Sequence, residues 1–255
     1  MPLHMSTFNL PPLPKPEPIA ANKGAEAVLK AVYAALATAG TGGPNPRIDL
    51  SGLDGDDRTL LSQILSEGEV SARIDGQSTV LIQESVFAGV WRVVEGGPDT
   101  VQEYVEIGVA PTLLTMVSRE RAHAWQFPDV VPDEVTNAAS ILTEIGEHLA
   151  TWQHGQPSHV VNLTLLPLSP PDVAFLDQVL GWGAVTILSR GYGNCRVTTT
   201  NVPYCWRAVY FNSEDTMILN TIEVTDLPNV VCAAPDDLRD SRERLHDVLN
   251  WVAIA

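Results

Sequence analysis

Basic residues are scarce in this chain of 255 residues, which carries 15 lysines and arginines against 31 aspartates and glutamates. The formal net charge is −16 at pH 7 and the isoelectric point is about 4.6. A surface this acidic repels a phosphate backbone, so the composition argues against DNA or RNA binding through a basic face. It favours a soluble protein that attracts basic partners.

Long apolar runs are also missing, since no stretch approaches the roughly 20 apolar residues that a membrane helix needs. The N-terminal segment MPLHMSTFNLPPLPKPEPIA does not combine a basic start with an apolar run, which is the pattern of a secretory signal. We therefore expect a cytoplasmic protein without membrane insertion.

Reactive motifs are equally sparse. The three cysteines, Cys195, Cys205 and Cys232, are not spaced like zinc, haem or iron–sulfur ligands, and we predict reduced thiols in or near a core. The sequence has no G-x-S-x-G elbow, and its glycine-rich stretches lack the P-loop lysine and the dinucleotide fingerprint. We expect neither catalytic residues nor a bound cofactor.

The most informative feature that is present is an internal repeat. With an offset of 115, residues 53–94 align with 168–209 without a gap, and eleven of the 42 positions are identical. The identities include the pair Trp91-Arg92, which aligns with Trp206-Arg207. Further matches follow, with Asp99-Thr100 on Asp215-Thr216 after a shift of one residue and Ile107 and Val109 on Ile222 and Val224. We interpret the repeat as a gene duplication.

Each copy predicts the same unit, namely a short strand, a helix, three or four antiparallel strands and a closing helix. Gly68 and Gly183 follow the first helix, where a left-handed residue is expected. The expected elements are 47–51, 56–66, 69–74, 79–85, 90–95, 101–109 and 132–152 in the first copy, and 160–166, 170–181, 184–189, 196–200, 205–211, 217–224 and 235–252 in the second.

The predicted fold class is therefore α+β, with two pseudo-symmetric halves tightly packed, since little linker composition separates them. We divide the chain into a Pro-rich flexible arm (1–22), an N-terminal helix and loop (23–44), repeat one (45–155) and repeat two (156–255).

The repeated pairs Trp91-Arg92 and Trp206-Arg207 lie in apolar strands, where neighbouring side chains point to opposite faces. One interpretation is structural, with the tryptophan in the core and the arginine braced on a carboxylate. The other is a clamp for an anion or a peptide carboxylate. Glu84 is a candidate partner of Arg92, although the second copy has a threonine there.

Two other groups of polar residues are candidates for binding. On strand 217–224, Thr221 and Glu223 share a face, which predicts a polar surface usable for recognition of a partner. Glu144 and His148, spaced i, i+4, are followed by His154 and His159, a set that could hold a metal. Because the set lacks the H-E-x-x-H order, we favour a solvated helix face and expect no metal.

The chain resembles the HupH/HyaF family of [NiFe]-hydrogenase expression/formation proteins. The resemblance is carried by LSEGEVSARI (65–74), IQESVFAGVWRV (82–93), VYFNSEDTMILNTIEV (209–224) and APDDLRDSRERL (234–245). It implies a non-catalytic, cytoplasmic accessory protein. Its expected partners are the iron–sulfur small-subunit precursor before twin-arginine export and other maturation proteins.

Two alternatives stay open at this point. One is a metal- or redox-handling factor that delivers or protects an iron–sulfur cluster, using the three cysteines or the histidines of 148–159. Neither the cysteines nor the histidines repeat at the 115 offset, so a symmetric metal site is not encoded. The other is a structural subunit of a larger maturation complex.

Overall fold

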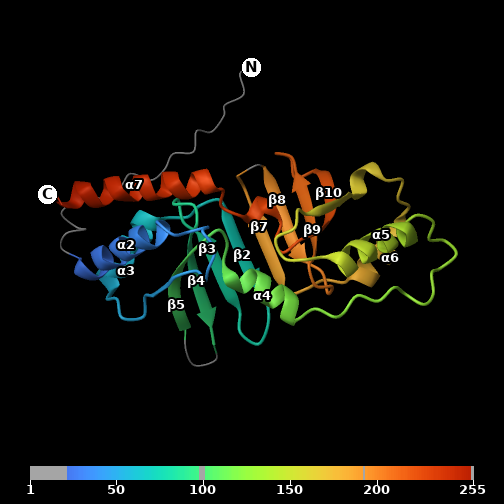
Figure 1. Cartoon of the computed structure of the whole chain (residues 1–255), viewed down its shortest axis with the longest axis horizontal. Coiled ribbons are helices and arrows are strands. Elements are labelled where there is room, and N and C mark those ends of the chain that lie inside the picture. Colours follow the sequence, from blue (N-terminus) through green and yellow to red (C-terminus); the bar gives the residue numbers. More distant parts are fainter. Residues whose placement is uncertain (1–21, 98–100, 192, 254–255) are drawn as a thin grey trace, which may run out of the picture.

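The ten strands of the described residues join in one antiparallel sheet through the middle of the molecule, with helices extending beyond it at both ends (Figure 1). The computed structural model describes residues 22–97, 101–191 and 193–253, so the predicted Pro-rich arm lies, apart from its last residue, outside the described residues. In chain order the strands are β1 Arg47–Asp49, β2 Val70–Ile74, β3 Val80–Glu84, β4 Val90–Gly96, β5 Val101–Ile107, β6 His159–Asn162, β7 Val185–Ser189, β8 Asn194–Thr199, β9 Cys205–Phe211 and β10 Met217–Val224.

The strand order is β1-β5-β4-β3-β2-β7-β8-β9-β10-β6. Each half of the sheet therefore has the same order from its outer edge inward: the first strand of the half, then its fifth, fourth, third and second. The halves meet where β2 pairs with β7, in a register that places Ala72 opposite Ile187. No gap separates the two halves at this level, because the sheet is continuous.

Helices cover the two ends of one face of this sheet (Figure 1). α2 and α3 pack over the first half and α5 and α6 over the second. The helical segments are α2 Lys23–Leu36, α3 Gly55–Leu65, α4 Thr112–Glu120, α5 Ala138–Thr151, α6 Pro170–Leu180 and α7 Pro235–Ala253, with single 3-10 turns η1 Leu163–Leu165 and η2 Asn229–Val231. No helix in the described ranges has the length and apolar character that crossing a membrane requires.

Corresponding aspartates lock the helix pairs together. Asp172, at the third position of α6, completes a capping box with Ser169 and also accepts the backbone N–H of Ala138 at the start of α5. Asp57 in α3 likewise accepts the N–H of Ala25 in α2. A carboxylate at a helix N-terminus satisfies otherwise unpaired N–H groups and meets the positive end of the helix dipole. Each aspartate therefore fixes the start of a second helix.

Gly68 and Gly183 are required for a different reason from the one predicted. Neither has a positive φ; the left-handed positions are Ser66 and Gly181, directly after α3 and α6. A Cβ on Gly68 would lie 2.2 Å from the carbonyl oxygen of Ser85, and one on Gly183 would lie 2.3 Å from Thr199 Oγ1. The glycines allow the chain to pass close to the sheet, where their N–H groups bond to strand carbonyls.

Apolar side chains form three buried clusters. Two lie under the helix layers at the ends of the sheet. The third lies on the opposite face, crosses both halves and includes Trp91 and Trp206, with α4 and the segment around Val231 packed on it. Because this third cluster crosses the β2–β7 joint, it holds the halves as one body.

The α+β class is confirmed, and most elements lie within a few residues of their predicted bounds. Three differences stand out. α4 was not predicted, the helix predicted at 132–152 begins only at Ala138, and that helix packs on α6, β6 and β10. α5 thus packs on the second half of the sheet and on its helix α6, as α2 packs on the first half and on α3. The duplication and the repeat boundaries stay predictions.

The last helix gives a test of how the halves depend on each other. α7 follows the second half in the chain but packs on α2 (Figure 1), and its Leu245 is fully buried there. We expect Leu245→Ala to lower the free energy of unfolding by about 2–4 kcal/mol, because it leaves a cavity. Arg239→Ala, on the exposed side of the same helix, should change it by less than about 0.5 kcal/mol. Equal effects in urea unfolding would show that α7 does not complete this core.

Candidate functional site

The centre of the helix-bearing face of the sheet is left open. α3 reaches Arg92 of β4 through Ser62, and α6 reaches Arg207 of β9 through Asp177. In the part of the chain that the structure describes, no helix packs over the central strands β3, β2, β7 and β8 on this side. Two leucines stand exposed in this open centre, Leu81 at 51% and Leu188 at 44%. The outward side chains here are Ser71, Arg73, Leu81, Gln83, Thr186, Leu188, Arg196 and Thr198.

A groove of about 880 Å³ lies between α3 and these strands. Leu61 and Leu65 of α3 line one side, and Leu81 and Leu188 contribute apolar surface from the sheet. Polar side chains complete the lining, among them Arg58, Ser71, Arg73, Gln83, Arg92 and Glu103. The groove crosses the β2–β7 joint, since it contains residues of both strands. Its mixture of leucines and polar groups suits an extended peptide better than a small charged ligand.

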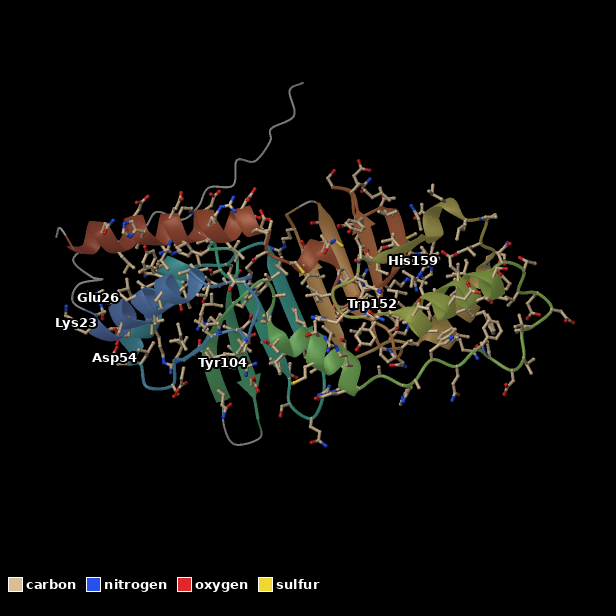
Figure 2. All side chains as sticks on the ribbon, in the orientation of Figure 1. Lys23, Glu26, Asp54, Tyr104, Trp152 and His159 are labelled. Carbon is tan, nitrogen blue, oxygen red and sulfur yellow. The ribbon has the colours of Figure 1, made fainter. Side chains whose placement is uncertain are left out.

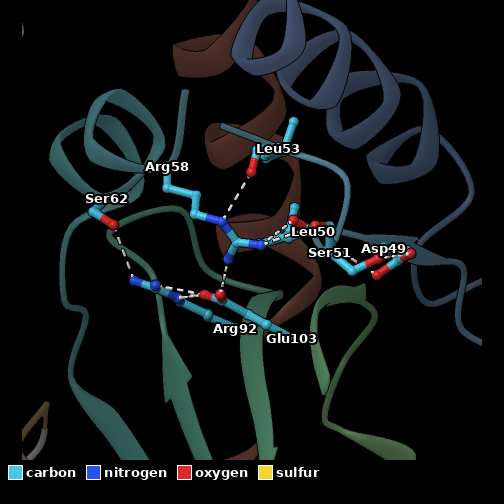
Figure 3. Close-up of polar contacts among 8 residues, drawn as sticks. All are labelled: Asp49, Leu50, Ser51, Leu53, Arg58, Ser62, Arg92 and Glu103. Carbon is cyan, nitrogen blue, oxygen red and sulfur yellow. Dashed lines mark hydrogen bonds and ion pairs between the residues drawn. The ribbon is translucent and has the colours of Figure 1, made fainter. Parts of the chain in front are cut away.

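The wall of the groove is held by an arginine pair around one carboxylate (Figure 3). Glu103 on β5 accepts hydrogen bonds from Arg92 on β4 and from Arg58 on α3. Arg92 also donates to Ser62 Oγ at 3.1 Å, and Arg58 donates to the carbonyl of Leu50 at 2.6 Å. The network ties α3 to the sheet. Arg92 is therefore occupied by partners within the chain, which matches the structural interpretation of the Trp-Arg pair.

The second half holds Arg207 in the same manner with the partners exchanged. Arg207 donates to Asp177 on α6 and to Asn220 Oδ1 on β10, and its guanidinium lies 5.4 Å from the Trp182 ring centre. In the first half the carboxylate is on the strand and a serine is on the helix. In the second half the carboxylate is on the helix and an amide is on the strand. Each arginine keeps one carboxylate.

Trp91 and Trp206 face away from the groove. Trp91 is 1% exposed and Trp206 is fully buried, and each donates its indole N–H to a backbone carbonyl, that of Gly108 at 2.9 Å and that of Thr225 at 3.2 Å. Their rings fill the shared core on the opposite face. Their predicted contact with a partner would require that core to open.

Glu84 is not the partner of Arg92. It sits opposite Trp91 in the β3–β4 register, on the other face of the sheet, where it is buried and accepts the Gly89 N–H at 3.3 Å. Burial, reinforced by the nearby negative charges of Glu69 and Asp237, raises the pKa of Glu84 to about 7.

The exposed polar face predicted around Thr221 and Glu223 is wrong. Their exposures are 3% and 8%, because they lie opposite Ala208 and Trp206 on the face of the sheet that carries the shared core. Thr221 Oγ1 donates to the Ala208 carbonyl at 3.3 Å and lies 3.2 Å from Glu223 Oε1. A partner-binding role for the two residues stays a prediction.

The strand pairing also revises the alignment of the repeats. Glu106 lies opposite Trp91 and Glu223 lies opposite Trp206, so β5 and β10 correspond with an offset of 117 instead of 115. An irregularity between Met217 and Leu219 accounts for one of the two added residues, and the longer connection 212–216, compared with 97–100, accounts for the other. The sequence alignment could not reveal this equivalence of two buried glutamates, because a bulge leaves no mark in residue identities.

The two buried glutamates have different surroundings. Glu106 Oε1 accepts from Asn45 at 2.8 Å and from the backbone N–H of Thr112 at 2.7 Å, and Arg47 lies 3.2 Å from Oε2. Glu223 has Thr221 as its hydrogen-bond partner, and burial raises the pKa of its carboxyl group. Glu106 is an ion-paired carboxylate at the start of α4, whereas Glu223 is a buried carboxyl group with little compensation for its lost solvation.

The histidine-rich segment separates into two parts. His159 on β6 lies 2.8 Å from Glu144 Oε1, and its ring stacks on that of His148, with 3.3 Å between the ring centres (Figure 2 labels His159). His154 is elsewhere, 2.6 Å from Asp226. The structure thus gathers Glu144, His148 and His159, whereas the sequence favoured a solvated face.

The cysteines form no such cluster among the described residues. Burial raises the pKa of Cys195 and Cys232 to about 11 and that of Cys205 to about 12. A thiol is a metal ligand or nucleophile as its thiolate, which is disfavoured at these three positions.

The fold and groove define an α+β protein with one continuous sheet and an open recess at its centre. The chain belongs to the HupH hydrogenase expression protein family. The model of the family's C-terminal conserved region matches residues 23–125 and 135–252.

Individual relatives carry related names. The hydrogenase expression/formation protein HoxQ of Cupriavidus necator is 59% identical over 254 residues, which are 99% of this chain and 90% of the relative. The hydrogenase-1 operon protein HyaF of Escherichia coli is 34% identical, over 82% of this chain and 74% of the relative. The solved structure of the hydrogenase expression protein HupH from Thiobacillus denitrificans is 29% identical and covers 43% of this chain and 92% of its own, with a TM-score of 0.41.

The glutamate pair predicts opposite responses to one substitution. Glu106→Gln should lower the free energy of unfolding by about 2–3 kcal/mol, because it removes the charge that Arg47 and the N–H groups face. Glu223→Gln should leave it unchanged or raise it at pH 7–8, because an amide has no ionisation to suppress. Urea unfolding of the two variants side by side would contradict this contrast if both lost stability equally.

Glu84 predicts a pH dependence. Its pKa is raised in the folded state, so its contribution to stability is complete below the unfolded value near 4.5 and is lost as the pH rises through about 7. From pH 5 to 8 the wild type should therefore lose stability relative to Glu84→Gln, by at most about 3 kcal/mol. Parallel stability curves for the two proteins would refute the assignment.

Proposed function

We propose that this protein is a non-catalytic accessory protein of [NiFe]-hydrogenase maturation. In this proposal it acts in the cytoplasm as a chaperone for the iron–sulfur small-subunit precursor before twin-arginine export. Membership in the HupH family and the names of the relatives support a role in hydrogenase expression and formation. The open groove carries the finer part of the proposal.

Among the described residues, no segment of the chain itself fills the groove, so its surface is open to an unfolded client. Leu81 and Leu188 are exposed on the sheet, whereas Leu61 and Leu65 of α3 beside them are already buried. An extended apolar segment, such as the hydrophobic part of a signal peptide, can cover Leu81 and Leu188 and remove their apolar surface from water.

Charge supports the same client. The net charge of −16 attracts a basic segment over a distance and raises the rate of encounter. The lining of the groove itself is not acidic, because Arg58, Arg73 and Arg92 line it with Glu67 and Glu103. The attraction of a basic segment therefore comes from the charge of the whole chain. A precursor with a basic start followed by an apolar stretch matches both features.

We further infer that the two halves arose by duplication and build one client site between them. The equal strand order, the matching aspartate caps and the two braced arginines support the duplication. The position of the groove across the β2–β7 joint supports a single shared site. In this proposal α5 is the first element of repeat two, because of its packing.

The proposal is tested by calorimetric titration of the full chain with small-subunit precursor, with and without its signal peptide. We expect saturable binding of the complete precursor that weakens in high salt. The double variant Leu81→Glu/Leu188→Glu should weaken binding at least tenfold, or about 1.4 kcal/mol. Both side chains are already exposed, so the fold should tolerate the change.

The matched control is Leu165→Glu, which changes a leucine of η1 that is 79% exposed and does not line the groove. This variant should bind like the wild type. No binding by the wild type would overturn the chaperone proposal. Equal binding by the groove variant and the control would place the client elsewhere on the molecule.

A further inference from the structure

The three residues around His159 come from two separate elements. Glu144 and His148 lie one turn apart on α5, and His159 begins β6, after a connection that reverses the chain. One ligand atom from each residue lies within 4.8 Å of the other two. Glu144 is exposed and His148 and His159 are not buried, so an ion can enter from solvent.

Two imidazoles and one carboxylate are the donor set of a first-row divalent cation. Imidazole suits zinc and nickel, and a carboxylate oxygen coordinates zinc at about 2.0–2.2 Å. The two imidazole rings stack face to face, inclined by 12° to each other. The terminal side-chain torsion of histidine is broad, so each ring can turn about it when an ion binds.

The neighbouring residues show that this gathering is selective. His154 is in the connection between α5 and β6, close in sequence to both histidines, yet its ring is held by Asp226. Among the His, Cys, Asp and Glu side chains of the described ranges, these three are the ones whose ligand atoms lie close enough together to hold one metal ion. Spacing i, i+4 explains Glu144 beside His148, but not the approach of His159 from the sheet.

We propose that Glu144, His148 and His159 bind one Zn²⁺ or Ni²⁺ ion. Three protein ligands leave at least one coordination position to water or to a donor from another molecule. The bound ion fastens α5 to β6 at the outer edge of the sheet. This site is separate from the groove and does not depend on the proposed client.

Calorimetric titration of the metal-stripped full chain with ZnCl₂ and with NiCl₂ tests the proposal. We expect one saturable site per chain for at least one of the two ions. His148→Ala, His159→Ala and Glu144→Gln should each weaken that site tenfold or more, while His154→Ala binds as the wild type does. Co²⁺ provides a second readout, because its visible absorption reports coordination by protein nitrogen and oxygen.

Two further variants separate this site from other donors. His4→Ala and Cys232→Ser should both retain full binding. The proposal is overturned if neither ion binds saturably to the wild type, or if binding persists unchanged in His148→Ala and His159→Ala. It is also overturned if His4→Ala or Cys232→Ser abolishes binding. The side chains of Glu144, His148 and His159 are not buried, so loss of metal with an unchanged circular dichroism spectrum reports ligation and not misfolding.

Discussion

The pairing of β2 with β7 is the interaction on which the rest of the structure depends. Five residue pairs in antiparallel register turn two five-strand sets into one sheet. Because the pairing strands are the innermost of each set, the helix layers at the two ends stay apart and the centre of one face stays open. The opposite face gains a core that neither half could close alone, with Trp91 and Trp206 on either side of the joint.

Helices are fixed to this sheet by charge as well as by apolar packing. In each half an arginine from the fourth strand of the set reaches a helix and a neighbouring strand, and one carboxylate balances it. The carboxylate has exchanged places between helix and strand. What the fold requires is thus one negative charge near the guanidinium, and either element can supply it. In the first half Arg58 shares the carboxylate of Glu103 with Arg92, so this cluster lines the groove with one positive charge in excess.

Local patterns predicted the elements well, and tertiary relationships were harder to read. The repeat and the strand alternation gave most bounds, and the alternation depends only on residues close in sequence. The burial of Thr221 and Glu223 depends on what covers their face, which alternation does not specify. Glycine is required at position 68 because a Cβ there would lie 2.2 Å from the carbonyl oxygen of Ser85. This close approach joins two segments that are separated in sequence. The approach of His159 to Glu144 is equally non-local.

The position of α7 has a consequence for synthesis on the ribosome. The helix is made after the ten described strands, yet its leucines complete the cluster that contains Ala25 and Leu29 of α2. The core over the first half therefore stays partly uncovered until α7 has left the ribosome. A chain cut short before α7 exposes this apolar surface to quality control.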